Sequence, residues 1–83
     1  MELASELWCI NCGNRGIPVI RARSMRKEKG HRKALYCTTC RMVINHIETR
    51  SVEEAEKFRE DFVAGRYTEE AEESIQYAKE HGI

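Results

Sequence analysis

Two Cys-x-x-Cys pairs constrain this chain more than any other feature of its sequence. Cys9 and Cys12 form the first pair, Cys37 and Cys40 form the second, and 24 residues lie between the pairs. Two intervening residues allow a tight turn that brings both sulfurs of a pair to one side of a metal ion, and two such pairs predict a zinc site. We therefore expect these cysteines to bind one Zn²⁺ ion. Because four protein ligands complete its tetrahedron, we expect the ion to be a structural cofactor.

The chain is short enough to need such a stabilising element. Its 83 residues allow one compact domain at most, and the core of so small a domain provides a thin margin of stability. Small domains commonly compensate with disulfides, a metal ion or a partner. If zinc has this role, its removal should unfold residues 8–48, because the free energy of metal binding is then free energy of folding.

Other uses of the cysteines stay open at this point. An iron site of the rubredoxin kind has the same four-thiolate geometry, so that spacing alone does not separate iron from zinc. Two disulfides would use the same four residues. A redox-active pair of the thioredoxin kind would need a βαβ pattern, which this sequence lacks.

The three histidines are weaker ligand candidates, because four thiolates already complete a tetrahedron. We expect His31 to be solvated within a basic loop. We expect His46 to lie on the surface of a strand, where it can contact a partner. His81 should stabilise the last turn of a helix, where a positive charge is favourable.

Nothing in the sequence indicates a membrane protein. No stretch approaches the ~20 apolar residues that a membrane-spanning helix needs. The N-terminal sequence is acidic and lacks the basic and apolar regions of a signal peptide. We therefore expect a cytoplasmic protein without membrane contact, in a reducing compartment where paired cysteines bind metal more often than they form disulfides.

The residues around the cysteines have the composition of short β-strands. We expect strands over residues 17–23, 33–36 and 42–48, the last of which is rich in β-branched residues. Gly13 directly follows the first pair, in a turn where a positive φ suits glycine. Arg41 occupies the equivalent place after the second pair, where its charge can offset that of the thiolates.

This succession resembles that of the zinc-ribbon superfamily, in which a cysteine knuckle, a strand and loop, a second strand, a second knuckle and a final strand follow one another. The resemblance covers residues 8–48, and it implies a three-stranded antiparallel sheet with the four cysteines as zinc ligands. Trp8 and Tyr36 each lie just before a cysteine pair, and we expect them to pack over the zinc site, with stacking on nucleic-acid bases as the alternative. Ribbons occur in transcription factors, RNA-polymerase subunits, ribosomal proteins and adaptors, so the resemblance implies no single function.

Residues after the last expected strand have helical spacing. Ser51 and Glu54 form a capping box that predicts the start of a helix, and Gly65 predicts its end. Apolar residues at three- and four-residue spacing predict its inner face, namely Val52, Ala55, Phe58 and Phe62. A second helix should follow, with Thr68 as its N-cap and Gly82 at its end. Its inner face should consist of Ala71, Ile75 and Ala78.

Together these elements predict a small α+β fold. Residues 1–50 should form the three-stranded antiparallel zinc ribbon, with a basic loop at residues 21–33. Residues 51–83 should form an acidic two-helix tail, arranged as a helical hairpin that packs on or beside the ribbon.

The net charge of zero hides a strong asymmetry. Residues 1–50 contain ten Lys and Arg against four Asp and Glu, a balance of +6, whereas residues 51–83 contain four against ten, a balance of −6. In residues 21–33 only Glu28 opposes a cluster of basic residues, which comprises Arg21, Arg23, Arg26, Lys27, Lys29, Arg32 and Lys33. Such a cluster is typical of a surface that contacts phosphates, but a solvated loop or one paired with the acidic tail has the same composition.

These patterns favour a binding module over an enzyme. The sequence has no Ser/His/Asp arrangement, no phosphate-binding loop and no metal site with an open position. The first hypothesis is a small regulator that engages nucleic acid, or a nucleic-acid-associated protein complex, through the seven basic residues. The second is a protein-binding adaptor or inhibitor that uses the ribbon edge and the acidic helices. Neither hypothesis involves a small-molecule substrate.

Overall fold

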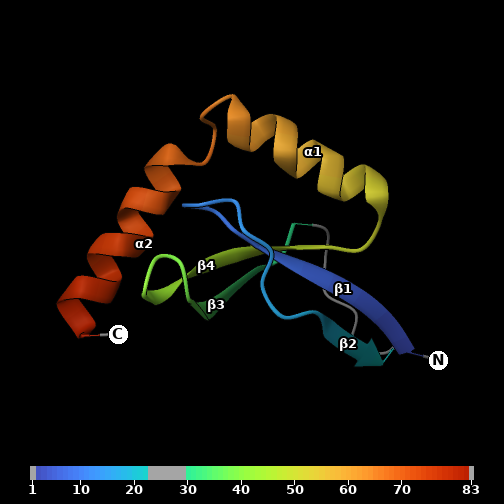
Figure 1. Ribbon diagram of the computed structural model, residues 1–83, viewed down its shortest axis with the longest axis horizontal. Helices are drawn as coiled ribbons and strands as arrows, with labels where there is room; N and C mark the ends of the chain where they lie inside the picture. Colours follow the sequence, from blue (N-terminus) through green and yellow to red (C-terminus); the bar gives the residue numbers. More distant parts are fainter. Residues whose placement is uncertain (1, 23–29, 83) are drawn as a thin grey trace.

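The computed structural model describes residues 2–22 and 30–82, and at residues 2–4, 21 and 22 it describes the backbone alone. Within these residues, four antiparallel strands form one curled sheet, and two helices lie along one of its faces (Figure 1). The fold is small α+β, as expected. The strands are β1 (Glu2–Cys9), β2 (Val19–Ala22), β3 (Arg32–Cys37) and β4 (Met42–Thr49), and the helices are α1 (Val52–Val63) and α2 (Thr68–His81).

The strands lie in the order β2-β1-β4-β3, so that β1 and β4 are central. The first half of β1 pairs with β2, and its second half pairs with β4. The whole of β3 pairs with the other edge of β4. In this register Cys9 of β1 is opposite His46, and Cys37 of β3 is opposite Met42. The two cysteines therefore flank β4 from its two sides, Cys37 at the first residue of the strand and Cys9 four residues further along.

The described sheet has four strands where the sequence predicts three, and β1 is the additional one. The N-terminal half of β1 is polar and small, and so lacks the β-branched and aromatic residues that mark a strand. Burial alternates along the second part of the observed strand. Ser5, Leu7 and Cys9 are buried, whereas Glu6 and Trp8 between them are half-buried. This alternation is the two-residue period of a strand.

The other three strands match the predicted segments to within two residues at each end. α1 also begins as the capping box predicts. The Ser51 hydroxyl accepts a hydrogen bond from the Glu54 backbone N–H at 3.2 Å, whereas the Glu54 carboxylate accepts one from the Arg50 N–H at 3.2 Å. Gly65, with a φ of +78°, follows the end of α1 as predicted.

The start of α2 differs from the prediction. Thr68 is the first helical residue rather than the cap, and Tyr67 at the cap position makes no capping hydrogen bond through its side chain. The Tyr67 ring instead packs against the Phe58 ring of α1, with the ring centroids 5.2 Å apart. Aromatic packing therefore places the start of α2. At its other end, Gly82 has a φ of +68° and ends the helix as predicted.

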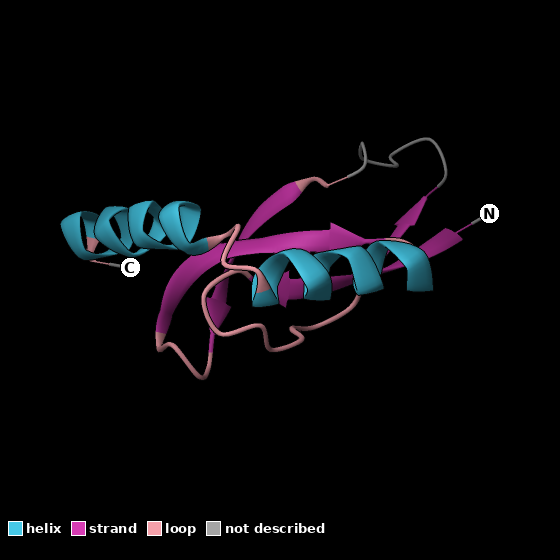
Figure 2. Cartoon of the chain, turned by 90° about the horizontal axis from the view of Figure 1, so that it is seen from above, coloured by secondary structure: helices cyan, strands magenta, loops and turns pink. Residues whose placement is uncertain are grey.

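The two helices diverge from the turn between them, and so do not form the predicted side-by-side hairpin. Figure 1 shows them as an arch over the sheet, and Figure 2 shows them one after the other along it. Phe58 of α1 and Ala71 of α2 join one apolar cluster with Ile10 and Ile47 of the sheet side. Each helix thus buries its apolar face against the sheet side and not against the other helix.

Backbone and side-chain contacts add to this packing. The backbone N–H of Asn45 in β4 donates to the Ser74 hydroxyl of α2 at 3.0 Å. Ala78 is buried and Ile75 is half-buried, as predicted for the inner face of α2. On α1 the predicted face is shorter than expected, since Val52 is 70% exposed. No helix in residues 2–22 and 30–82 is long and apolar enough to cross a bilayer.

Trp8 and Tyr36 do not pack over the cysteines, contrary to expectation. Trp8 stacks on Phe58 with centroids 5.9 Å apart, and its Nε1 donates to the Thr49 hydroxyl at 2.9 Å. Tyr36 is 60% exposed. The reason is the alternation of a strand, because Trp8 and Tyr36 each precede a cysteine and therefore point to the opposite face of the sheet.

Candidate metal centre

The four cysteines come from two similar turns, which follow β1 and β3. In the first turn the Gly13 N–H donates to the Cys9 carbonyl at 2.9 Å, and in the second the Arg41 N–H donates to the Cys37 carbonyl at 2.7 Å. Gly13 and Arg41 both have a positive φ, of +76° and +58°. Arg41 thus takes the backbone conformation of a glycine, at a cost of ~1–2 kcal/mol for an L-residue.

The four sulfur atoms form a compact cluster. All of them lie within 4.8 Å of one another. The sulfurs of Cys9 and Cys40 are 3.8 Å apart, and those of Cys12 and Cys37 are 3.6 Å apart. Four thiolates at ~2.3 Å from a zinc ion would be ~3.8 Å apart along the edges of a regular tetrahedron. The cluster therefore has the size that a tetrahedral metal site requires.

The four cysteines do not form disulfides in the structure. A disulfide requires sulfurs about 2.0 Å apart, and all four cysteines are free thiols. Within the described residues, the metal-sized group of ligand atoms consists of these four thiols alone. Of the uses that the sequence leaves open, the structure supports metal binding by all four cysteines.

Burial and hydrogen bonds act in opposite directions on the thiols. Burial raises the pKa of Cys9 and of Cys12 above the ordinary thiol value, although backbone N–H groups of the first turn lower it in part. Burial acts in the same direction on Cys37, but hydrogen bonds from the Cys40 backbone and the Cys12 thiol outweigh it, and the pKa of Cys37 is lowered. The lowered pKa brings the Cys37 thiol closer to the thiolate, which is the form that binds metal.

Two asparagine side chains connect the turns. The Asn14 amide donates to the Thr39 hydroxyl at 2.8 Å, and the Asn11 amide donates to the Cys40 sulfur at 3.3 Å. Both asparagines are exposed. Sequence reasoning missed them, because neither has a ligand-type side chain, and the spacing of the cysteines does not distinguish them from their neighbours.

Apolar side chains support the cluster from the sheet and from both helices. Ile44 of β4 is 1% exposed and packs against Cys9 and Cys37, with Ile75 of α2 among the partly buried residues around them. Gly13 lies beneath α1, where an added Cβ atom would stand 3.1 Å from two ring carbons of Phe62. The cysteine cluster is therefore part of the same packing that holds the helices on the sheet.

The histidines take no part in the cluster. His46 is 2% exposed, with its Nδ1 at 2.9 Å from the Ile44 carbonyl, and so it is not the surface residue that we expect from the sequence. The reason is that β4 is a central strand and is buried over most of its length. His31 is half-buried rather than solvated. His81 lies in the last turn of α2 with its Nδ1 at 2.9 Å from the Tyr77 carbonyl, as predicted.

The seven basic residues are only partly described. Arg32 and Lys33 lie in β3, exposed and half-buried respectively, and Arg21 lies in β2, where the backbone alone is described. Four further residues of the cluster lie outside the described residues, namely Arg23, Arg26, Lys27 and Lys29. Their role as phosphate contacts stays a prediction.

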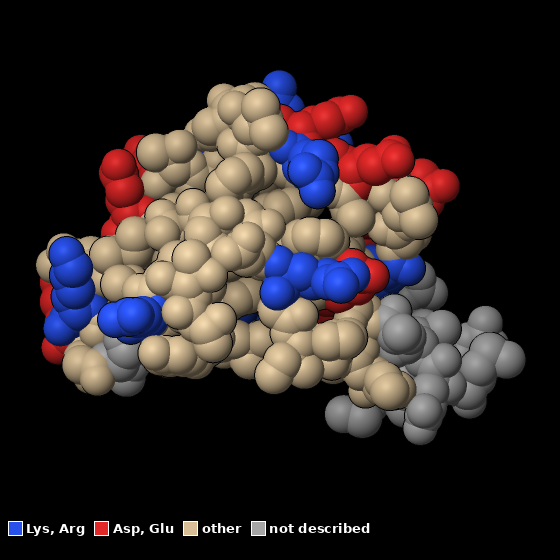
Figure 3. Space-filling model, viewed as in Figure 1, with Lys and Arg blue, Asp and Glu red and all other residues tan. Residues whose placement is uncertain are grey.

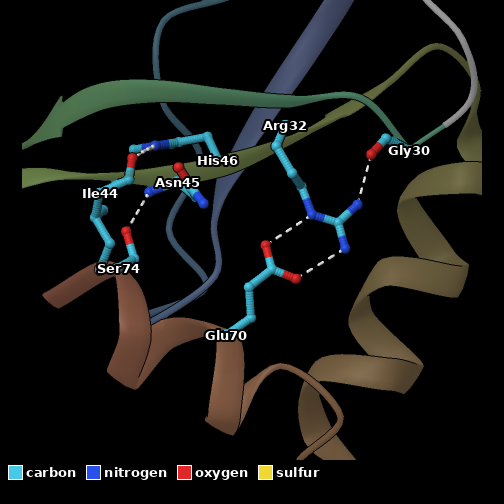
Figure 4. Close-up of polar contacts among 7 residues, drawn as sticks. All are labelled: Gly30, Arg32, Ile44, Asn45, His46, Glu70 and Ser74. Carbon is cyan, nitrogen blue, oxygen red and sulfur yellow. Dashed lines mark hydrogen bonds and ion pairs between the residues drawn. The ribbon is translucent and has the colours of Figure 1, made fainter. Parts of the chain in front are cut away.

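Arg32 is paired with the acidic tail (Figure 4). Its Nε and Nη2 donate to the two carboxylate oxygens of Glu70 in α2, at 2.8 and 3.0 Å, and its Nη1 donates to the Gly30 carbonyl at 2.5 Å. The guanidinium carbon also lies 5.7 Å from the centroid of the Tyr67 ring. The hydrogen bond with Glu70 raises the pKa of Arg32 further. Of the alternatives for the basic cluster, Arg32 therefore follows the one in which a basic residue pairs with the acidic tail.

Charges of both signs cover the outer side of the helices. Figure 3 shows acidic side chains over α1 and α2, with Lys and Arg among them. Some acidic residues are paired locally, since Asp61 lies 3.2 Å from the Lys57 ammonium and 2.6 Å from the Arg66 guanidinium. The acidic tail is therefore partly neutralised by its own basic residues.

A groove of about 790 Å³ lies between α1 and the first cysteine turn. Trp8, Phe58 and Phe62 contribute aromatic side chains to its lining. Val52 and Val63 at the two ends of α1 also line it and are 70% and 80% exposed.

Comparisons with protein-family models, with curated proteins and with solved structures find no match to this chain.

Proposed function

We propose that this chain is a zinc-stabilised binding module of the zinc-ribbon kind, which engages nucleic acid or a nucleic-acid-associated protein complex. The observation that carries the metal part is the cluster of four thiols within 4.8 Å, in which two sulfur–sulfur distances, 3.8 and 3.6 Å, are close to the edge of a thiolate tetrahedron. Soft thiolate ligands in a tetrahedron favour zinc, with iron as the other candidate. Four protein ligands leave no open position, so the ion would stabilise the fold and would not activate a substrate.

The positive charge of the basic loop at residues 21–33 is the argument for a polyanionic partner. It begins in β2 and ends in β3, so that both of its ends belong to the sheet. Arg32 already forms an ion pair with Glu70 of α2. We therefore propose that phosphates contact the other six basic residues, and that Arg32 holds the end of the loop against α2.

The metal part is tested by measuring zinc content and folding together. Native mass spectrometry should detect one zinc ion per chain, and Cys40→Ser should lose both the ion and the folded signal in circular dichroism. Thr38→Ser, in the same turn but without a ligand atom, is the matched control. A metal-free chain that keeps its fold would contradict the proposal.

The partner is tested by the salt dependence of nucleic-acid affinity. The zinc-loaded chain should bind DNA or RNA oligonucleotides with an affinity that falls steeply with salt. Replacing Arg26 and Lys27 by glutamine should reduce the slope on duplex DNA by about 2, because each lost phosphate contact contributes ~0.9. The control replaces Arg59 and Lys79 on the helices, which removes the same charge elsewhere. An unchanged slope in the loop variant would refute the proposed contact.

The groove beside α1 favours a protein-binding adaptor as the second candidate. Val63 is 80% exposed at its edge, and apolar surface of this kind typically contacts protein. Recovery of partners from the host in a pull-down should then resist nuclease and be lost with Val63→Glu. Nuclease-sensitive recovery that survives Val63→Glu would instead favour the nucleic-acid proposal.

A further inference from the structure

We infer that Asn11 is a positioning residue of the metal centre, and that its side-chain amide donates a hydrogen bond to the Cys40 thiolate and thereby raises metal affinity. The inference rests on the proposed function, because it requires that the four cysteines bind a metal ion. It goes beyond that function by assigning a role to a residue that is not a ligand.

The hydrogen-bond donors of the four sulfurs follow a pattern. In each turn, the first cysteine accepts hydrogen bonds from the backbone of its own turn. Cys9 accepts them from the backbone N–H groups of Asn11 and Cys12. Cys37 accepts them from the backbone N–H groups of Thr39 and Cys40, the latter at 3.5 Å.

The second cysteine of each turn departs from this symmetry. Cys12 accepts a hydrogen bond from the backbone N–H of Asn14, two residues further on. Cys40 accepts a hydrogen bond at 3.3 Å from the Asn11 side chain. An amide from the first turn thus serves the second turn in the way that backbone N–H groups serve the other sulfurs.

The chemistry of the amide matches this role. A metal-bound thiolate carries negative charge and can only accept hydrogen bonds, and the amide NH₂ group can only donate. Four thiolates around one divalent ion leave a net charge of about −2, which N–H donors around the sulfurs offset. Because donor and acceptor belong to different turns, the bond also holds the second turn in register with the first.

Asn14 provides a matched control within the same chain. Asn11 and Asn14 are both exposed asparagines of the first turn, and the side chain of each bonds to the second turn. The Asn14 amide, however, donates to the Thr39 hydroxyl at 2.8 Å and not to a sulfur. Asn11→Ala and Asn14→Ala therefore both remove a bond between the turns, but only the first removes a donor to a thiolate.

The experiment measures Zn²⁺ affinity by competition with a chromophoric chelator, and the absorption spectrum of the Co²⁺-loaded full chain. Asn11→Ala should lower Zn²⁺ affinity by roughly 10-fold or more, and it should shift the thiolate-to-cobalt charge-transfer band. Asn11→Asp should lower affinity further, because its carboxylate would face the thiolate. Asn11→Gln keeps the amide and should recover part of the loss. Asn14→Ala should leave the charge-transfer band in place.

Equal losses of affinity in the Asn11→Ala and Asn14→Ala variants, with unchanged cobalt spectra, would overturn the inference while leaving the four-cysteine site intact. A native chain that binds neither Zn²⁺ nor Co²⁺ would overturn the proposed function and this inference together. Circular dichroism of each zinc-loaded variant checks that the comparison is made between folded chains.

Discussion

Replacing Gly13 by alanine tests whether the first cysteine turn and α1 are packed against each other. Gly13 has a φ of +76°, a conformation that costs an L-residue ~1–2 kcal/mol. The new Cβ would also stand 3.1 Å from two ring carbons of Phe62, so the ring must shift by a few tenths of an ångström. Such overpacking costs a further ~1 kcal/mol. We expect Gly13→Ala to lower the free energy of unfolding by ~2–3 kcal/mol.

Gly65 separates the two contributions. Its φ of +78° matches that of Gly13. A Cβ at Gly65 would meet only the Thr68 hydroxyl oxygen, at the ordinary contact distance of 3.6 Å. Gly65→Ala should therefore show the backbone cost alone, ~1–2 kcal/mol. The difference between the two variants measures the contact between the turn and α1.

Urea unfolding of the zinc-loaded variants, followed by Trp8 fluorescence, provides the measurement. Trp8 reports on this region because its ring stacks on Phe58, which also contacts Phe62. Phe62→Leu should recover part of the loss in the Gly13→Ala background, since the smaller side chain makes room for the Cβ. Equal losses for Gly13→Ala and Gly65→Ala, with no recovery by Phe62→Leu, would refute this packing.

Three further predictions concern the metal, an ion pair and a buried ring. Chelation of the metal should remove the sheet signal from circular dichroism, because metal binding supplies folding free energy; retention of that signal would contradict a structural role. Arg32→Gln should lower the free energy of unfolding by less than ~1 kcal/mol, and high salt should reduce the effect, because the pair with Glu70 is partly exposed; a loss of several kcal/mol in urea unfolding would contradict this. His46→Ala should cost ~2–4 kcal/mol in the same assay, because it opens a cavity at a site only 2% exposed and removes a side-chain partner of the Ile44 carbonyl; a neutral result would contradict the burial.

The features that the sequence predicts correctly depend on residues that are close to one another in the chain. The cysteine spacing predicts the cluster, because a two-residue gap limits where the second sulfur of a pair can lie. Ser51 predicts the start of α1, and Gly65 predicts its end, because each satisfies a backbone requirement within a few residues. The positive φ of Arg41 could also be expected, from its equivalence with Gly13.

The features that the sequence does not predict depend on contacts between residues that are distant in the chain. β1 forms because β2 and β4 pair with its two halves, a condition that its own composition does not express. Tyr67 takes the cap position of α2 because its ring packs on Phe58. The amide of Asn11 reaches a sulfur 29 positions away in the chain. No local pattern contains these partners, so the sequence alone could not predict them.

The cysteine cluster and the basic loop lie toward opposite ends of the strands that connect them. Cys37 and Arg32 are the two ends of β3, about 17 Å apart at the rise of an extended strand. On the other side Ala22, where the loop leaves β2, pairs with Glu2 at the far end of β1 from Cys9. On the proposed function, a metal in the cysteine cluster would therefore act on a partner at the loop through the order of the sheet and not through contact. Asn11→Ala should then leave nucleic-acid affinity unchanged in a chain saturated with zinc, whereas Cys40→Ser should lose zinc and nucleic acid together, since the sheet that holds both ends of the loop would no longer form.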